Sequence, residues 1–192
     1  MTTPDAATWD RRYAERDHLW RSDPHEMVPT VVTGLTPGRA LDVAAGEGRH
    51  AVWLAERGWE VTAIDFSAVG LGRGEAEARR RGLDVTWVVD DITTWAPPHD
   101  YALVLVSFMH LPADVFGTLR RYVAPGGHLL VVGHARRNLT DGVGGPQDPA
   151  MLLDLDQLRA AAGELTVLRL EETERVTPTG TAIDIVLDAR RD

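Results

Sequence analysis

Short apolar runs rich in β-branched residues alternate along this chain with segments of helical periodicity. The apolar runs cover residues 39–45, 60–66, 85–90, 101–108 and 128–133, and most are apolar almost throughout. Strands that are buried on both faces of a parallel sheet have this composition. The helical segments cover residues 48–57, 67–81, 112–123 and 154–162. The alternation predicts an α/β fold in which helices flank a parallel sheet.

Two strand-like runs at the end of the chain break this alternation. Residues 165–176 and 181–190 are separated by a loop that is too short for a crossover connection. They therefore predict an antiparallel hairpin. The result is a single-domain, Rossmann-like sheet of seven strands, with five parallel strands and the C-terminal hairpin. We expect this core over residues 39–192, and a helical lid or substrate segment over residues 1–38, laid across one edge of the sheet.

The composition excludes several kinds of chemistry and partner. The chain of 192 residues has no Cys, which rules out disulfides and thiolate metal sites, and we expect no metal. All 20 basic residues are Arg, so no lysine is available as a base. A net charge of −9 argues against nucleic acid as a partner. The polar N-terminus and the absence of a long apolar run predict a soluble, cytoplasmic protein without a membrane segment.

A glycine-rich turn follows the first predicted strand, in the stretch LDVAAGEGRH at residues 41–50. Such a turn lets a ligand approach the backbone, and the N-terminus of the next helix offers free N–H groups. Gly46 and Gly48 are the glycines of this turn. Asp65 ends the second strand 17 residues after Gly48, near the spacing at which a carboxylate holds ribose hydroxyls. Asp91 follows the third strand, where an acid can bind an adenine amino group.

Two nucleotide cofactors compete for this turn. Gly46, Gly48 and Ala51 satisfy the dinucleotide pattern G-x-G-x-x-G/A. Against NAD, Asp42 stands where that pattern prefers an apolar residue, the core leaves no room for a substrate domain, and no Tyr–Lys pair is possible. We expect Asp42 to hold the turn in shape and to reach a cofactor only through water.

The same stretch resembles motif I of the class I S-adenosylmethionine-dependent methyltransferases, with Ala44 in place of the first glycine. The resemblance continues through VVDDITTW, LVSFMHLP and the Pro-Gly-Gly at residues 125–127. It implies S-adenosylmethionine as cofactor and S-adenosylhomocysteine as product. The glycines would pass the methionine portion, Asp65 would hold the ribose, and Ser107 and Phe108 would lie beside the sulfur. The full set of implied cofactor contacts is Asp42, Ala44, Gly46, Gly48, Asp65, Phe66, Asp91, Ile92, Ser107 and Phe108.

The opening WDRRYAERDHLW resembles the small methyltransferases of the tellurite-resistance and thiopurine type. This resemblance favours a small, soft nucleophile as acceptor, such as a thiol, selenide, telluride or halide. We expect Trp9, Tyr13 and Trp20 to contact that substrate. Arg136 and Arg137, in the long glycine-rich loop 134–149, are candidates for binding an anionic acceptor.

Other functions stay open at this point. His110 and His134 follow the fourth and fifth strands, and either is a candidate base for an O- or N-methyltransferase of secondary metabolism. We expect the other histidines, His25 among them, to be superficial or structural. The alternative to an enzyme is a cofactor-binding sensor or a degenerate binding partner. The sequence decides neither between a monomer and a homodimer nor against a protein acceptor.

Overall fold

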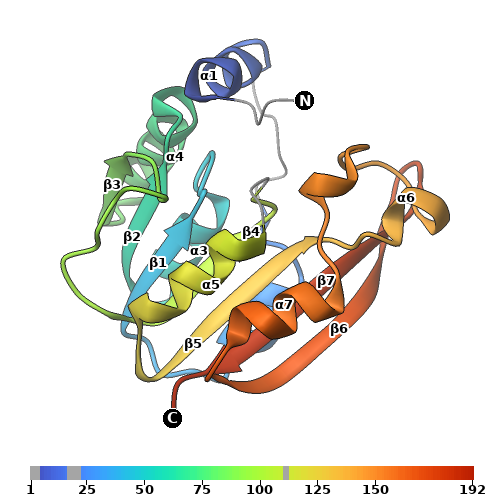
Figure 1. The fold of residues 1–192 in the computed structure, drawn as a ribbon. Coiled ribbons are helices and arrows are strands. Elements are labelled where there is room, and N and C mark those ends of the chain that lie inside the picture. Colours follow the sequence, from blue (N-terminus) through green and yellow to red (C-terminus); the bar gives the residue numbers. More distant parts are fainter. Residues whose placement is uncertain (1–4, 17–22, 110–112) are drawn as a thin grey trace.

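The computed structural model describes residues 5–16, 23–109 and 113–192 of the chain. Seven strands form one sheet in the order β3-β2-β1-β4-β5-β7-β6 (Figure 1). They are β1 (Arg39–Val43), β2 (Glu60–Asp65), β3 (Val85–Val89), β4 (Tyr101–Ser107), β5 (Val123–His134), β6 (Thr166–Thr177) and β7 (Gly180–Arg190). The first five strands are parallel, and β7 runs antiparallel to both β5 and β6. The predicted sheet with its terminal hairpin is confirmed.

Helices cover both faces of this sheet (Figure 1). They are α1 (Ala6–Ala14), α2 (Met27–Val32), α3 (Arg49–Ala55), α4 (Ala68–Arg81), α5 (Ala113–Leu119), α6 (Asn138–Asp141) and α7 (Leu155–Ala162), with 3-10 turns at Arg120–Tyr122 and Pro149–Met151. Successive side chains of a strand point to opposite faces. Leu41 and Val43 of β1 therefore pack with α5 and α7, whereas Ala40 packs with α2, α3 and α4. The sheet is buried on both faces, as the continuous apolar runs predict.

The ends of α4 and the start of α7 follow directly from the sequence. The Ser67 side chain accepts a hydrogen bond from the Gly70 amide at the start of α4, and Gly82 ends this helix in a left-handed conformation. Asp154 and Gln157 form a capping box at the start of α7. The helices predicted over residues 67–81 and 154–162 are confirmed.

The third predicted helix, over residues 112–123, is too long. α5 ends at Leu119, and β5 already begins at Val123. The Pro-Gly-Gly sequence lies within β5, where the pairing with β4 shifts register and Gly126 has a φ of 74°. A Cβ on Gly127 would lie 2.9 Å from the carbonyl oxygen of Tyr101. The glycines therefore form a bulge against β4 rather than a helix stop.

The described part of residues 1–38 is not laid across a sheet edge, and this corrects the expectation. α1 packs against α4, beyond the sheet itself (Figure 1). α2 places Met27, Val28 and Val32 in the same core cluster as Ala40 of β1. The face of the sheet therefore holds α2, because these apolar side chains need a buried partner surface.

Candidate active site

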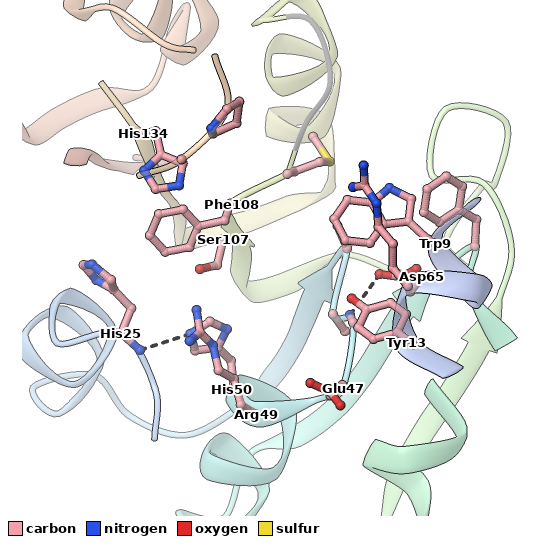
Figure 2. A pocket seen from close by; sticks show the side chains of 18 of the residues that line it. Trp9, Tyr13, His25, Glu47, Arg49, His50, Asp65, Ser107, Phe108 and His134 are labelled. Carbon is pink, nitrogen blue, oxygen red and sulfur yellow. Dashed lines mark hydrogen bonds between the residues drawn. The ribbon is translucent and has the colours of Figure 1, made fainter. Parts of the chain in front are cut away.

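A cavity of about 2250 Å³ opens at the carboxyl ends of β1, β2 and β4. Ligands of open α/β sheets bind at this edge, between strands whose connections lead in opposite directions. An ordinary small-molecule pocket has at most about 1,000 Å³, so this one has room for two molecules. Figure 2 shows two groups of lining side chains, with Asp65 and Trp9 in one and Phe108 and His134 in the other.

The turn after β1 keeps its backbone in left-handed conformations. The φ angles are 55° at Ala44, 56° at Gly46 and 73° at Gly48. A residue with a Cβ rarely has a positive φ, and such strain is found mainly at functional sites. Ala44 therefore preserves the backbone geometry of motif I at a position where the motif has glycine.

The two glycines of this turn have different neighbours. Gly46 lines the cavity, and a Cβ there would lie 2.6 Å from the hydroxyl oxygen of Tyr13. Gly48 does not line the cavity, and a Cβ there would lie 2.5 Å from the ring of Trp87 and 3.2 Å from the Cα of Gly74. Gly46 thus leaves space for a ligand, whereas Gly48 lets α3 pack closely against β3 and α4. The contact expected between Gly48 and the cofactor stays a prediction, and the neighbouring Glu47 and Arg49 line the cavity.

Asp65, at the end of β2, has its carboxylate fixed by two backbone amides. Oδ2 accepts a hydrogen bond from Gly46 N at 2.9 Å, drawn in Figure 2, and Oδ1 accepts one from Ser67 N at 2.8 Å. Burial raises the pKa of Asp65, and the two amide bonds oppose that shift. Because each carboxylate oxygen has a second lone pair, this positioned side chain can still accept hydrogen bonds from a ligand.

The cavity continues from Asp65 to Phe66, Asp91 and Ile92. Oδ1 of Asp91 accepts hydrogen bonds from the Thr93 amide at 2.8 Å and from the Thr93 hydroxyl at 2.7 Å. Ile92 is buried and offers an apolar wall. The strand ends thus bring together the residues that the sequence assigns to the adenosine portion of a cofactor.

Two polar side chains near the turn have no hydrogen-bond partner among the described residues. They are Asp42, only 1% exposed, with both carboxylate oxygens unpaired, and Ser107, whose buried hydroxyl is unpaired. Burial raises the pKa of Asp42 to about 7, although the nearby Ala51 amide, which does not meet hydrogen-bond geometry, and the charge of Arg49 oppose the shift. Ser107 lines the cavity, whereas Asp42 does not. Buried polar groups are normally hydrogen-bonded, so an unpaired hydroxyl at a cavity wall suits a ligand.

Phe108 marks the other end of the cavity. It follows β4 with a φ of 53°, a strained conformation for a bulky side chain. Its ring centroid lies 4.7 Å from that of His134 and 5.4 Å from that of His25 (Figure 2). The guanidinium carbons of Arg49 and Arg175 lie 6.0 Å and 5.7 Å from the same ring. An aromatic surface surrounded by imidazole and guanidinium groups therefore forms this end.

Asp184 of β7 connects three of these side chains. It is fully buried, and its Oδ2 lies 3.0 Å from His25 Nε2 and its Oδ1 3.2 Å from His134 Nδ1. Arg175 of β6 donates to the same carboxylate. Burial alone would raise the pKa of Asp184, but His134, His25 and Arg175 hold it well below its usual range. The carboxylate is therefore ionised and anchors both histidines.

α1 is fastened to α4 beside the cavity. Asp10 Oδ1 accepts a hydrogen bond from the Ser67 hydroxyl at 2.6 Å. Arg73 of α4 donates to the carbonyl oxygen of Tyr13. Tyr13 is buried, and both Trp9 and Tyr13 line the cavity. Trp20, the third aromatic residue expected here, lies outside the described residues.

Arg136 and Arg137 do not reach the cavity. Arg136 Nε lies 3.3 Å from Asp154 Oδ2, and Arg137 Nε donates to Glu172 Oε2 at 2.8 Å. Their side chains are 45% and 46% exposed. This placement corrects the expectation that they bind the acceptor, because both guanidinium groups lie in surface ion pairs. His110, one of the two candidate bases, lies outside the described residues.

The sequence did not indicate His25, Arg175 or Asp184 as site residues. His25 is buried and lines the cavity, as does Arg175. One signal for Asp184 was available, since it is an acid within the apolar run TAIDIVLD. Asp42 is likewise an acid within an apolar run. An acid in a strand that is buried on both faces needs partners or a function.

Within residues 5–16, 23–109 and 113–192, no three His, Asp or Glu side chains cluster as metal ligands would. The helices in those ranges are all too short or too polar to cross a bilayer.

Residues 40–127 match the family described as a methyltransferase domain. A demethylmenaquinone methyltransferase from Renibacterium salmoninarum is 35% identical over 104 residues, which are 51% of this chain and 42% of that protein. A ubiquinone biosynthesis O-methyltransferase from Alkalilimnicola ehrlichii is 31% identical over 111 residues, 55% of this chain and 45% of that protein. The chain thus matches less than half the length of these curated relatives.

Solved structures share the fold over nearly the whole chain. TehB from Haemophilus influenzae superposes with a TM-score of 0.76 at 18% identity, covering 97% of this chain and 67% of that chain. The N-methyltransferase NodS from Bradyrhizobium japonicum WM9, in complex with S-adenosyl-L-homocysteine, gives 0.72 at 16% identity and covers 97% of both chains. The match of residues 40–127 to the methyltransferase-domain family, together with the shared fold, confirms the predicted resemblance of this chain to the class I S-adenosylmethionine-dependent methyltransferases.

Proposed function

We propose that this protein transfers a methyl group from S-adenosylmethionine to a small molecule. One observation carries the proposal, namely that a single cavity joins the strained turn after β1 to the His and Arg side chains around Asp184. The first end suits the cofactor and the second suits the acceptor. Methyl transfer needs mainly that the two reactants are held in line and that water is excluded.

The residues at the first end fit an adenosyl cofactor. Gly46 has no side chain to block the ligand, and Asp65 retains lone pairs for ribose hydroxyls. Asp91 and Ile92 would frame the adenine, and the unpaired Ser107 hydroxyl would face the methionine portion or the sulfur. When bound, S-adenosylmethionine supplies an electrophilic methyl group on a sulfonium sulfur.

Two classes of acceptor are compatible with the second end. A soft nucleophile, which the N-terminal sequence favours, is supported by the guanidinium groups of Arg49 and Arg175 near Phe108. An oxygen or nitrogen acceptor is supported by His134 beside Asp184, and by relatives named as O- and N-methyltransferases. We favour an acceptor that carries a proton, because a paired imidazole at the cavity can remove it.

Residues 1–38 would act as a lid and substrate segment. α1 brings Trp9 and Tyr13 to the cavity, and His25 reaches its acceptor end. Aromatic rings over a sulfonium exclude water and favour the cation through their faces. This role explains why a segment outside the sheet contributes buried polar contacts such as that of Asp10 with Ser67.

The proposal is tested with methyl-labelled S-adenosylmethionine, the purified protein and a cell extract separated by mass. We expect label in the low-mass fraction only when the protein is present. Asp65→Ala should abolish most of the incorporation, whereas the surface variant Asp141→Ala should retain it. Label in protein or nucleic acid would contradict a small-molecule acceptor. Tight binding of S-adenosylhomocysteine without any transfer would instead support the sensor alternative.

A further inference from the structure

His25 is fixed in one tautomer by its neighbours. The backbone N of Met27 donates to His25 Nδ1 at 3.3 Å, so this nitrogen is an acceptor. The proton therefore resides on Nε2, which lies 3.0 Å from Asp184 Oδ2. Arg175 donates its Nε to the same oxygen. Oδ2 of Asp184 thus has two partners, and Oδ1 accepts a hydrogen bond from Arg175 Nη2 at 3.3 Å and lies 3.2 Å from Nδ1 of His134.

The ring of His134 is held between two surfaces. Phe108 lies on one side with a centroid distance of 4.7 Å, and a Cβ on Gly145 would lie 3.1 to 3.2 Å from the ring. Gly145 has a φ of 73°, which lets the backbone approach this closely. Asn138 holds the loop in place, accepting from Ile183 N at 2.7 Å and donating to the Gly144 carbonyl at 2.9 Å.

The second nitrogen of His134 is available to a ligand. Nδ1 of His134 lies 3.2 Å from the ionised carboxylate of Asp184 without meeting hydrogen-bond geometry, and the negative charge at this distance favours a proton on that nitrogen, which leaves the lone pair on Nε2. No described residue forms a hydrogen bond with Nε2, and His134 lines the cavity. Asp184 therefore orients the imidazole at Nδ1, and the basic Nε2 lies on the side of the ring away from Asp184.

We infer that Asp184 is a positioning residue that holds His134 as a general base, and that the acceptor is a neutral molecule with an O–H, N–H or S–H group. This inference rests on the proposed methyltransferase function and adds the acceptor class to it. Transfer forms a bond from the acceptor atom to the methyl carbon and breaks the bond from that carbon to sulfur, whose electron pair stays on sulfur. The acceptor proton moves to Nε2 of His134, and Asp184 stabilises the resulting imidazolium.

Other charged and titratable groups face this end of the cavity and contribute to any pH dependence. They are His25 from the N-terminal segment, Arg49 and His50 from α3, Asp148 from the loop before α7, Arg175 from β6 and Asp184 from β7. Burial lowers the pKa of His50, and its Nε2 accepts from the His25 amide, so it stays neutral. The methylation rates of the variants are therefore compared at a single pH as well as over a range of pH.

The experiment compares Asp184→Asn with Asp188→Asn in the full-length protein. Asp188 is a matched control because its Oδ1 lies 2.7 Å from His128 Nδ1, both side chains are buried, and this pair also joins β5 to β7. Neither His128 nor Asp188 lines the cavity. Nitrogen NMR spectra of the histidine side chains report the tautomer of each ring without any acceptor present.

We expect the native protein and Asp188→Asn to show His134 protonated on Nδ1, and Asp184→Asn to lose this preference. The probes for transfer are phenol, which keeps its proton at about pH 8, and thiophenol, which is ionised there. Removing the base should slow phenol methylation by roughly 10²- to 10⁴-fold, and removing its orienting carboxylate by roughly 10- to 100-fold. Thiophenol methylation should change by only a few-fold in either variant.

His134→Gln provides a second test in case Asp184→Asn does not fold. This variant leaves Asp184 paired with His25 and Arg175. The fall in phenol methylation at low pH should be present in the native protein and absent from this variant. An unchanged tautomer in Asp184→Asn, equal losses with both probes, or transfer to thiophenol alone would overturn the inference. If neither probe is methylated, the tautomer of His134 in Asp184→Asn decides whether Asp184 positions this ring. Failure of S-adenosylhomocysteine to bind the native protein would instead refute the proposed function.

Discussion

Asp42 carries an electrostatic cost beside the site. Its carboxylate is buried in β1 without a hydrogen-bond partner among the described residues, and burial raises its pKa to about 7. The folded protein therefore holds Asp42 protonated below neutral pH, whereas the unfolded chain ionises it from about pH 4. Ionisation above neutral pH is destabilising, which is the kind of cost that functional sites retain.

The stability of the protein should depend on pH through Asp42. The pKa of Asp42 is higher in the folded protein than in the unfolded chain, so the free energy of unfolding is not reduced by Asp42 below about pH 4, where both states are protonated. It falls by about 1.4 kcal/mol per pH unit from about pH 4 to about pH 7, and the loss is constant above that. Asp42→Asn should be more stable than the native protein at about pH 8 and comparable near pH 4. Urea unfolding of both proteins across this range measures the difference. A difference that does not vary with pH would show that Asp42 is ionised throughout.

Asp65→Ala should weaken the binding of S-adenosylhomocysteine by about 10- to 150-fold, because each charge-assisted hydrogen bond contributes roughly 1.5 to 3 kcal/mol. The substitution also leaves the backbone amides of Gly46 and Ser67 without the carboxylate that accepts their hydrogen bonds in the native protein. Titration calorimetry gives the affinity, and Asp141→Ala, an exposed acid in α6, is the control. Equal affinities in folded native and Asp65→Ala proteins would mean that another acid holds the ribose.

The contact between α1 and α4 decides whether the N-terminal segment covers the cavity. Arg73 of α4 donates to the carbonyl oxygens of Tyr13 and Arg16, and to Glu47 Oε1 at 2.8 Å. Tyr13 packs so closely that a Cβ on Gly70 would lie 2.9 Å from its ring. One arginine thus ties the end of α1 to both α4 and the cofactor turn.

Arg73→Ala should release α1 while leaving the sheet folded. We expect faster hydrogen exchange in Ala6–Ala14 and unchanged exchange in β1 and β4, because the bonds that are lost join Arg73 to the end of α1 and to Glu47 in the turn, and none involves the strands. Arg79→Ala is the matched control, since Arg79 is on the same helix and pairs with Glu75 on the exposed surface. Exchange in α1 that is equal in the two variants would show that Arg73 does not hold this helix.

The alternation of strands and helices predicts the sheet because each element buries its own apolar residues. The turn at Gly46 and the strand ends at Asp65, Ile92 and Phe108 are equally visible, since connection rules bring the carboxyl ends of parallel strands together. The cluster at Asp184 was not predictable in this way. Its members come from four segments whose meeting depends on the register of the hairpin and on the path of the N-terminal segment. The positions expected for Arg136 and Arg137 were wrong for the same reason, because the sequence of a loop does not determine the direction of its side chains.

The molecule as a whole divides the cavity between its two halves. β1, β2 and β3 with α4 and α1 form the cofactor end, whereas β5, the β6–β7 hairpin and the loop after β5 form the acceptor end (Figure 1). Ser107, the last residue of the central β4, lines the cavity next to Phe108, which belongs to the second of these ends. Under the proposed function, the hairpin and the N-terminal segment would select the acceptor while the first three strands hold the cofactor.

Titration calorimetry of the native protein with S-adenosylhomocysteine, and separately with NADH, tests the cofactor site most directly. The turn at Gly46, the positioned carboxylate of Asp65 and the wall at Ile92 should bind S-adenosylhomocysteine at one site per chain. NADH should give no comparable heat, because Asp42 stands where the dinucleotide-binding pattern prefers an apolar residue. Saturable binding of NADH with no response to S-adenosylhomocysteine would contradict the assignment of this cavity to a methyltransferase.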